Sequence, residues 1–112
     1  MKHLLVTLAV LTLVIGLSAH AASEITAKYT AKTKILTIAY NHSVKDPAAH
    51  FIQGIQVRLN DFTIISQVAS AQDDASGGEF IYRIPNLKKG DVLDIILDCN
   101  KGGRLTRKMV LN

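Results

Sequence analysis

The chain consists of short segments in which apolar and polar residues alternate, separated by turn-forming residues. The clearest of these segments covers residues 51–59, where the apolar side chains recur at every second position from Ile55 to Leu59. Asn60 and Asp61 follow it and precede another apolar segment, a pattern that predicts a tight two-residue hairpin. No stretch after residue 22 has the periodicity of an amphipathic helix. The pattern therefore restricts this part of the chain to β structure.

The alternating segments define the number of strands and the class of fold. We expect strands at residues 25–30, 35–41, 51–59, 62–68, 79–84, 92–99 and 104–111. About seven short strands without helices predict an all-β, immunoglobulin-like antiparallel β-sandwich. The chain has no Trp and a single Cys. This excludes the antibody type, whose core is built on a Trp and a disulfide.

The N-terminal residues have the pattern of a cleavable signal peptide. Lys2 precedes an uncharged run from Leu4 to Leu17, and Ala19 and Ala21 offer the small residues that a signal peptidase requires. The run is shorter than the roughly 20 apolar residues of a membrane-spanning helix. We therefore expect residues 1–21 to be a signal peptide, cut after Ala21 or Ala22. Residues 22–112 would then form one exported domain, in the periplasm or secreted.

Charge and composition restrict the partners of this domain. The whole chain has a formal net charge of +4, and its basic residues are scattered apart from a loose group at Arg104, Arg107 and Lys108. Nucleic-acid binding requires clustered basic residues with stacking aromatic side chains, so we expect no nucleic-acid partner. We also expect no membrane association after signal cleavage. A protein partner at an exposed sheet edge, or a second copy of the chain, remains open.

Cys99, His42 and His50 are the candidate metal ligands. Cys99 is the only cysteine, so it cannot form an intramolecular disulfide in an oxidising compartment. His42 and His50 are the histidines expected to remain after processing, and they bracket one loop between two strands. Imidazole and thiolate together suit iron, copper or zinc. Because loops at one end of a sandwich gather in space, the three side chains could share a site.

Each of the three candidate residues could also have a purely structural role, without binding a metal. Cys99 is in phase with the apolar residues of its strand, and a free Cys is among the most frequently buried residue types. Each His is equally consistent with an ordinary polar loop residue. The chain has no nucleophile elbow, no phosphate-binding glycine loop and no zinc-protease helix. We therefore expect neither catalytic residues of those kinds nor an organic cofactor.

Two stretches resemble the superoxide reductases, the family of the desulfoferrodoxin iron-binding domain. The segment His42-Ser-Val-Lys-Asp-Pro-Ala-Ala-His50-Phe-Ile resembles their iron-site loop, which a His opens and a second His, followed by an aromatic residue and Ile, closes. Residues 99–103, Cys-Asn-Lys-Gly-Gly, resemble their cysteine ligand turn. The resemblance covers about residues 36–109. It implies the sandwich fold and a mononuclear iron site held by His42, His50 and Cys99.

The ligand set departs from the pattern of that family. Gly102 stands where the family has a His in the cysteine turn, and residues 23–41 contain no His to supply the N-terminal ligand. The loop between His42 and His50 is also longer than expected. The resemblance therefore implies a degenerate metal site with a redox or metal-binding role, taking iron, with copper or zinc as alternatives. If a redox-active iron is bound, superoxide reduction is expected to be slow or absent.

The same region also resembles SoxZ, a non-catalytic subunit of a bacterial sulfur-oxidation carrier complex. Residues 49–53, 89–91 and 100–102 carry this second resemblance. It implies a binding module whose sheet edge contacts a partner and in which Cys99 is simply buried. SoxZ proteins usually lack the signal peptide expected here. The sequence thus leaves two hypotheses open, a metal-binding or redox protein and a non-catalytic binding module.

Overall fold

The computed structural model describes residues 20–112, so the expected signal peptide lies outside the described residues except for His20 and Ala21. Within residues 20–112 the structure contains seven strands and no helix, which confirms the all-β prediction. No helix of this region is long and apolar enough to cross a membrane. The strands are β1 (Glu24–Thr30), β2 (Ile35–Asn41), β3 (Ile52–Leu59), β4 (Phe62–Val68), β5 (Gly77–Arg83), β6 (Val92–Cys99) and β7 (Arg104–Val110).

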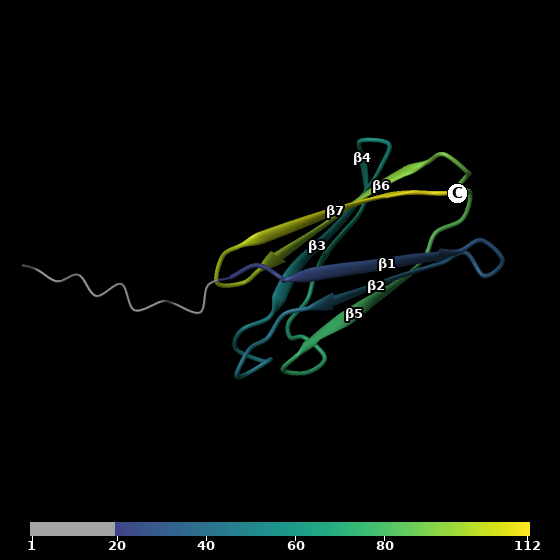
Figure 1. Cartoon of the computed structure of the whole chain (residues 1–112). Helices are drawn as coiled ribbons and strands as arrows, with labels where there is room; N and C mark the ends of the chain where they lie inside the picture. Colours follow the sequence, from purple (N-terminus) through teal and green to yellow (C-terminus); the bar gives the residue numbers. More distant parts are fainter. Residues whose placement is uncertain (1–19) are drawn as a thin grey trace, which may run out of the picture.

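The strands form two antiparallel sheets that face each other. One sheet has the order β1-β2-β5 and the other has the order β4-β3-β6-β7. Figure 1 shows the two layers, with β1, β2 and β5 on one side and β3, β6 and β7 on the other. β1 and β7 contact each other across the layers. This arrangement is the predicted β-sandwich.

The turns follow the chemistry of their residues, and the largest shift of a strand boundary lies at the start of β5. Asn60 and Asp61 have φ values of 46° and 73°, the positive values that a type I′ hairpin requires, which confirms the two-residue turn. β5 begins at Gly77 instead of the expected residue 79, because Gly77 and Gly78 pair with the end of β2. A Cβ at Gly78 would lie 2.8 Å from the hydroxyl of Tyr40. These glycines therefore allow close strand pairing where the sequence suggested a loop.

The core lies between the two sheets and uses alternate residues of each strand. Its fully buried side chains are aliphatic, and they are Leu36, Ile38, Ile52, Ile55, Val57, Leu93, Ile95 and Leu97. On β6 the inward positions run from Leu93 to Leu97 at every second residue, and Cys99 continues the same alternation. Burial of such residues is the main favourable contribution to folding. The core thus carries Cys99 to one end of the sandwich on a rigid strand.

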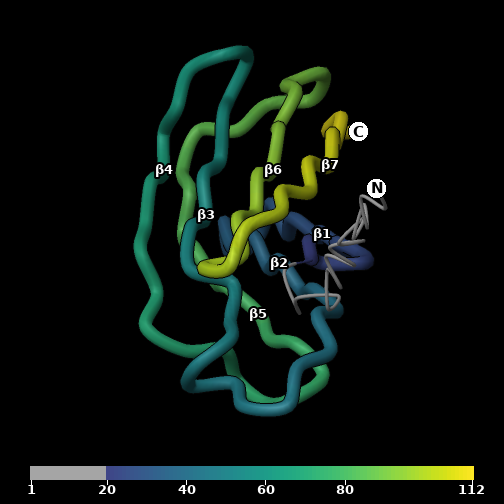
Figure 2. The backbone as a smooth tube through the Cα atoms, turned by 90° about the vertical axis from the view of Figure 1, so that its left-hand side faces the viewer, coloured from purple at the N-terminus to yellow at the C-terminus, as the bar shows by residue number. Residues whose placement is uncertain are grey.

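Two long loops meet at that end. Residues 42–51 connect β2 to β3, residues 69–76 connect β4 to β5, and both lie at the lower end of the tube in Figure 2. The amide of Gln72 donates to the carbonyl of Pro47 at 3.1 Å, and the amide of His42 donates to the carbonyl of Ser76 at 2.8 Å. These hydrogen bonds hold the two loops together beside the open end of the core.

Replacing a core residue should cost much more stability than replacing an exposed residue of the same type. Ile55 is fully buried, whereas Ile81 on β5 is 58% exposed. We expect Ile55→Ala to lower the free energy of unfolding by about 2–5 kcal/mol through the cavity it leaves. Ile81→Ala should change it by about 0.5 kcal/mol or less. Denaturant unfolding checks both variants, and equal losses would contradict the assignment of the core.

Candidate metal centre

Three histidines gather at the end of the sandwich where Cys99 lies. His20 precedes β1, His42 follows β2 and His50 precedes β3, and one ligand atom from each lies within 4.8 Å of the others. His42 and His50 are buried, and His20 is exposed. Cys99 lies outside this tighter group but contacts it, because its Sγ is 3.1 Å from Nε2 of His50. The structure therefore brings the three predicted ligands together and adds His20.

His42 is held in one orientation by Gln72. The side-chain nitrogen of Gln72 donates to the carbonyls of His42, at 2.8 Å, and Asp74, at 2.9 Å. These two bonds direct Oε1 of Gln72 toward the ring, where it lies 2.8 Å from Nδ1 of His42. Nδ1 must therefore carry a hydrogen, and in a neutral ring Nε2 then carries the lone pair. Gln72 is an outer-shell partner of the kind that orients a histidine for metal binding.

His50 and Cys99 form a buried nitrogen–sulfur pair. Burial lowers the pKa of His50 below its ordinary value, and the neighbouring rings of His42 and His20 lower it further. A neutral His50 keeps a lone pair for a metal. The backbone amide of Lys101 lies 3.4 Å from Sγ of Cys99 and donates to it. His50 and Cys99 thus offer a metal one nitrogen donor and one softer sulfur donor, side by side.

The turn that carries Cys99 is fastened to the segment that carries His50. Phe51 donates its amide to the side-chain oxygen of Asn100 at 2.9 Å, and the side-chain nitrogen of Asn100 donates to the carbonyl of Ala49 at 3.0 Å. The amide of Asn100 donates in turn to the carbonyl of Phe51 at 3.0 Å. These three hydrogen bonds fix the separation of Cys99 and His50.

His20 is seated among the same residues. Its ring centroid lies 4.5 Å from that of His42 and 4.9 Å from that of His50. Its Nε2 donates to the carbonyl of Ser43 at 3.0 Å, which places a hydrogen on Nε2 and the lone pair on Nδ1. The carbonyl oxygen of His20 lies 3.1 Å from Nε2 of His42. Two lone pairs would repel each other at this distance, so a proton or a metal cation at Nε2 would stabilise the contact.

Gly103 leaves room for the backbone beside His20. A Cβ at Gly103 would lie 2.5 Å from the nitrogen of Ala21 and 2.8 Å from the carbonyl carbon of His20. Figure 1 shows the chain entering the domain beside this β6–β7 turn. Only a residue without a side chain allows so close an approach. A side chain at position 103 would therefore displace His20 from its place in the cluster.

Gly102, where the resembling family has a histidine, differs from Gly103 in its surroundings. Its φ is 104°, a conformation that L side chains rarely adopt, and a Cβ there would meet nothing within 4 Å. A histidine at position 102 would have space but a strained backbone. The additional imidazole of this site comes instead from His20.

Two residues of the candidate centre were not predicted from the sequence. His20 lies in the expected signal peptide, and Gln72 lies in a polar loop. The close packing of His20 against Gly103 could not be read from the sequence, because it depends on the β6–β7 turn meeting a segment distant in the chain. Gln72 gives no signal in the sequence that distinguishes it from other loop amides.

The donor set fits a resident transition metal. It offers three imidazole nitrogens and one thiolate sulfur, a combination used for zinc, iron and copper. His42 and Cys99 have outer-shell partners in Gln72 and Lys101. His20 would bind through Nδ1, as its hydrogen bond to Ser43 assigns. Both ring nitrogens of His42 face oxygen acceptors, so His42 would bind through Nε2 once the contact of that nitrogen with the carbonyl of His20 opens.

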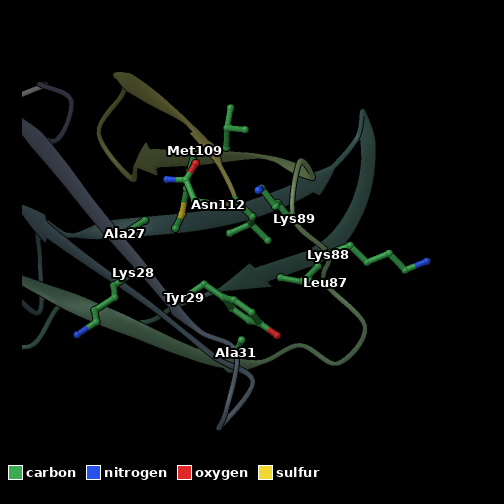
Figure 3. A pocket seen from close by; sticks show the side chains of 11 residues that line it. Ala27, Lys28, Tyr29, Ala31, Leu87, Lys88, Lys89, Met109 and Asn112 are labelled. Carbon is green, nitrogen blue, oxygen red and sulfur yellow. The ribbon is translucent and has the colours of Figure 1, made fainter.

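The groove in Figure 3 lies elsewhere and contains no metal ligands of this kind. It has a volume of about 310 Å³ and is lined by apolar side chains that include Tyr29, Leu87 and Met109, with lysines at its rim. It includes the C-terminal part of β1, whereas His20 precedes the start of that strand. No His or Cys lines it. Within residues 20–112, the cluster of His20, His42 and His50 lies away from this groove.

Comparison with known proteins supports the fold and leaves the family unassigned. No protein-family model matches the chain, and no curated protein matches it either. Among solved structures, the chain is similar to a superoxide reductase (1Fe-SOR) from Giardia intestinalis, with a TM-score of 0.58 and 17% sequence identity. That match covers 83% of this chain and 98% of the other. The chain thus has the fold of a superoxide reductase, as the sequence resemblance implied.

Two further structures are more distant. A superoxide reductase (neelaredoxin) from Ignicoccus hospitalis matches with a TM-score of 0.48 and 18% identity, over 80% of this chain and 79% of that one. The spore cortex lytic enzyme SleM from Clostridium perfringens matches with a TM-score of 0.49 and 13% identity, over 84% of this chain but 28% of the enzyme. Neither adds to the assignment. The resemblance to SoxZ stays a prediction.

Removing the acceptor of Gln72 should weaken metal binding. Gln72→Leu takes away the partner of Nδ1 of His42, so we expect the affinity for Co(II) to fall about 10–100-fold, the usual effect of losing an outer-shell partner. Gln72→Glu keeps an oxygen acceptor for Nδ1 but places its second oxygen against the carbonyls of His42 and Asp74, so it should retain only part of the affinity. Titration by absorbance measures both variants, and thermal unfolding reports any loss of folding. Equal affinities for wild type and Gln72→Leu would contradict this role.

Gly102 and Gly103 offer a matched pair for testing the position of His20. Their φ values are 104° and 105°, so alanine strains the backbone similarly at both positions, but only at Gly103 does its Cβ meet the His20 segment. We expect Gly103→Ala to weaken Co(II) binding more than Gly102→Ala does. If the two single variants lose the same Co(II) affinity, the packing at Gly103 does not position a ligand.

Proposed function

We propose that this chain is an exported, mononuclear metal-binding protein with a redox role, built on the superoxide reductase fold. The metal is held by the imidazoles of His20, His42 and His50 and by the thiolate of Cys99. Iron is the first candidate, with copper or zinc as alternatives. The localisation, in the periplasm or secreted, rests on the N-terminal sequence pattern.

One observation carries this proposal. Three imidazoles have ligand atoms within 4.8 Å of one another, and the single cysteine of the chain lies 3.1 Å from one of them. Two of these imidazoles and the thiol are buried, beside a core of aliphatic side chains and Tyr40. All four side chains have hydrogen-bond partners within the protein, and a shared cation would bind all four donor atoms at once.

The residues of the site define what it can do when a metal is present. A bound iron would supply one-electron chemistry toward a small oxidant. Sγ of Cys99 supplies negative charge and a soft donor, while the neutral rings of His42 and His50 supply nitrogen donors inside the protein. His20 lies at the exposed side of the cluster. A small molecule would therefore approach the centre from that side.

The ligand set supports metal binding better than it supports rapid superoxide reduction. Gly102 offers no side chain at the position where the resembling family has a histidine. We therefore expect superoxide turnover to be slow or absent. A bound metal would instead exchange electrons with a different small oxidant or with an electron-transfer partner.

A non-catalytic binding module remains the alternative. Edge strand β4 exposes Phe62 and Val68, each 76% accessible, together with Ile64. An exposed apolar edge of this kind suits a protein partner or a second copy of the chain. In this SoxZ-like function Cys99 would be an inert core residue. A protein that binds no metal would favour this alternative.

Metal titration of the ligand variants tests the proposal. We expect one metal per chain, and we expect Cys99→Ser to weaken binding most, because it removes the charged, soft donor. His42→Ala and His50→Ala should each weaken binding less, and the double variant should abolish it. Ile81→Ala serves as a control outside the site. Calorimetry with Fe(II), Cu(II), Zn(II) and Co(II) provides the measurement.

The affinity of the wild type decides the outcome. If the wild type binds none of these metals with a dissociation constant below about 100 μM, a binding free energy of roughly −5.5 kcal/mol, the proposal is contradicted. A Cys99→Ser variant that binds as tightly as the wild type would contradict it as well.

A further inference from the structure

His20 belongs to the folded domain, although the sequence pattern places it before the expected cut. Its ring donates to the carbonyl of Ser43, and its backbone lies against Gly103. Ala22 is buried at 4% exposure, and the amide of Ser23 donates to the carbonyl of Asn41 at 2.8 Å. The segment is thus tied down from its first described residue.

The hydrogen bonds of His20 assign the donor atom of its ring. Nε2 donates to a backbone carbonyl, which can only accept, so Nδ1 carries the lone pair. Nδ1 and the backbone nitrogen of one histidine are close enough along the covalent structure to close a small chelate ring around a metal. An amide nitrogen in mid-chain is a poor donor for this purpose, whereas a free α-amine is a good one.

We propose that signal peptidase cuts the precursor between Ala19 and His20, so that the mature chain begins at His20 and offers a metal both its α-amine and Nδ1. Ala19 supplies the small residue directly before the cut, while Leu17 occupies the position two residues before Ala19. The reaction is hydrolysis of the Ala19–His20 peptide bond. Water adds its hydroxyl to the carbonyl carbon of Ala19 and a hydrogen to the nitrogen of His20. The inference rests on the proposed metal centre and adds a nitrogen to it.

The competing cut after Ala21 satisfies the small-residue spacing with Ala19 and Ala21 but removes part of the site. It would discard the ring that lies between His42 and His50 and the hydrogen bond to Ser43. It would also leave the space above Gly103 without the backbone that fills it. Two imidazoles and one thiolate would remain. A cut before His20 keeps every one of these contacts.

The position of the cut is tested by the intact mass of the exported protein. The full precursor is expressed in a bacterial host, the mature protein is purified from the periplasm or the medium, and its N-terminus is sequenced. We expect a chain of residues 20–112. A mature chain that begins at any other residue, Ala22 and Ser23 included, would overturn the proposal.

The role of the amine is tested by moving it one residue away. One alanine is inserted between Ala19 and His20, and mass spectrometry identifies exported chains that carry it before His20. These chains keep the imidazole of His20 but place the free amine elsewhere. We expect Zn(II) affinity to fall about 10–100-fold, at least the loss known for outer-shell partners. Unchanged affinity would overturn the amine ligand.

A second background separates chelation from a general effect of the extension. In a His20→Ala protein the same insertion should have little effect on Zn(II) affinity, because the chelate is already lost. An equal loss in both backgrounds would overturn the chelate. If the proposed metal-binding function is wrong, none of these proteins binds Zn(II). The mass of the exported chain still shows where the precursor is cut, so the two failures can be told apart.

Discussion

The site depends on how Asn100 joins two segments that are distant in the sequence. Its backbone amide and both ends of its side chain form hydrogen bonds with residues 49–51. Because His50 lies within that segment and Cys99 immediately precedes Asn100, the same contacts set the separation of Nε2 and Sγ. β6 supplies Cys99 on a buried strand, β3 pairs with it at Ile52, and Asn100 fastens the segment that carries His50 to the turn after Cys99.

The centre is assembled on this junction from four parts of the chain. The segment before β1 brings His20 over Gly103, the end of β2 brings His42, and the loop after β4 brings Gln72 to orient His42. Each contribution comes from backbone hydrogen bonding or from a glycine that permits close approach. The aliphatic core fixes the strands, and the polar contacts at one end then select the orientation of the ligands.

Much of the fold was predictable because strand periodicity and turn chemistry are local. The alternation of β6 and the Asn60-Asp61 hairpin were read from neighbouring residues. The boundary of β5 was wrong by two residues, because Gly77 and Gly78 look like loop residues until their pairing with β2 is known. Sheet order and register depend on contacts between strands that no local pattern reports.

The candidate site was predictable only in part. His42, His50 and Cys99 could be chosen from the sequence because imidazole and thiolate are scarce and chemically distinctive. His20 and Gln72 could not be chosen, because their roles arise from hydrogen bonds between segments that meet only in the folded domain. The tautomers of His20 and His42 likewise follow from partners that the sequence does not identify.

X-ray absorption spectroscopy of the exported protein, loaded with one zinc per chain, distinguishes a ligand Cys99 from a buried structural cysteine. If Cys99 is a ligand, the spectrum contains one sulfur scatterer at about 2.3 Å together with nitrogen scatterers at about 2.0–2.1 Å. The sulfur contribution should disappear in Cys99→Ser. A wild-type spectrum of nitrogen and oxygen scatterers alone would show that Cys99 is not a ligand of the proposed metal centre.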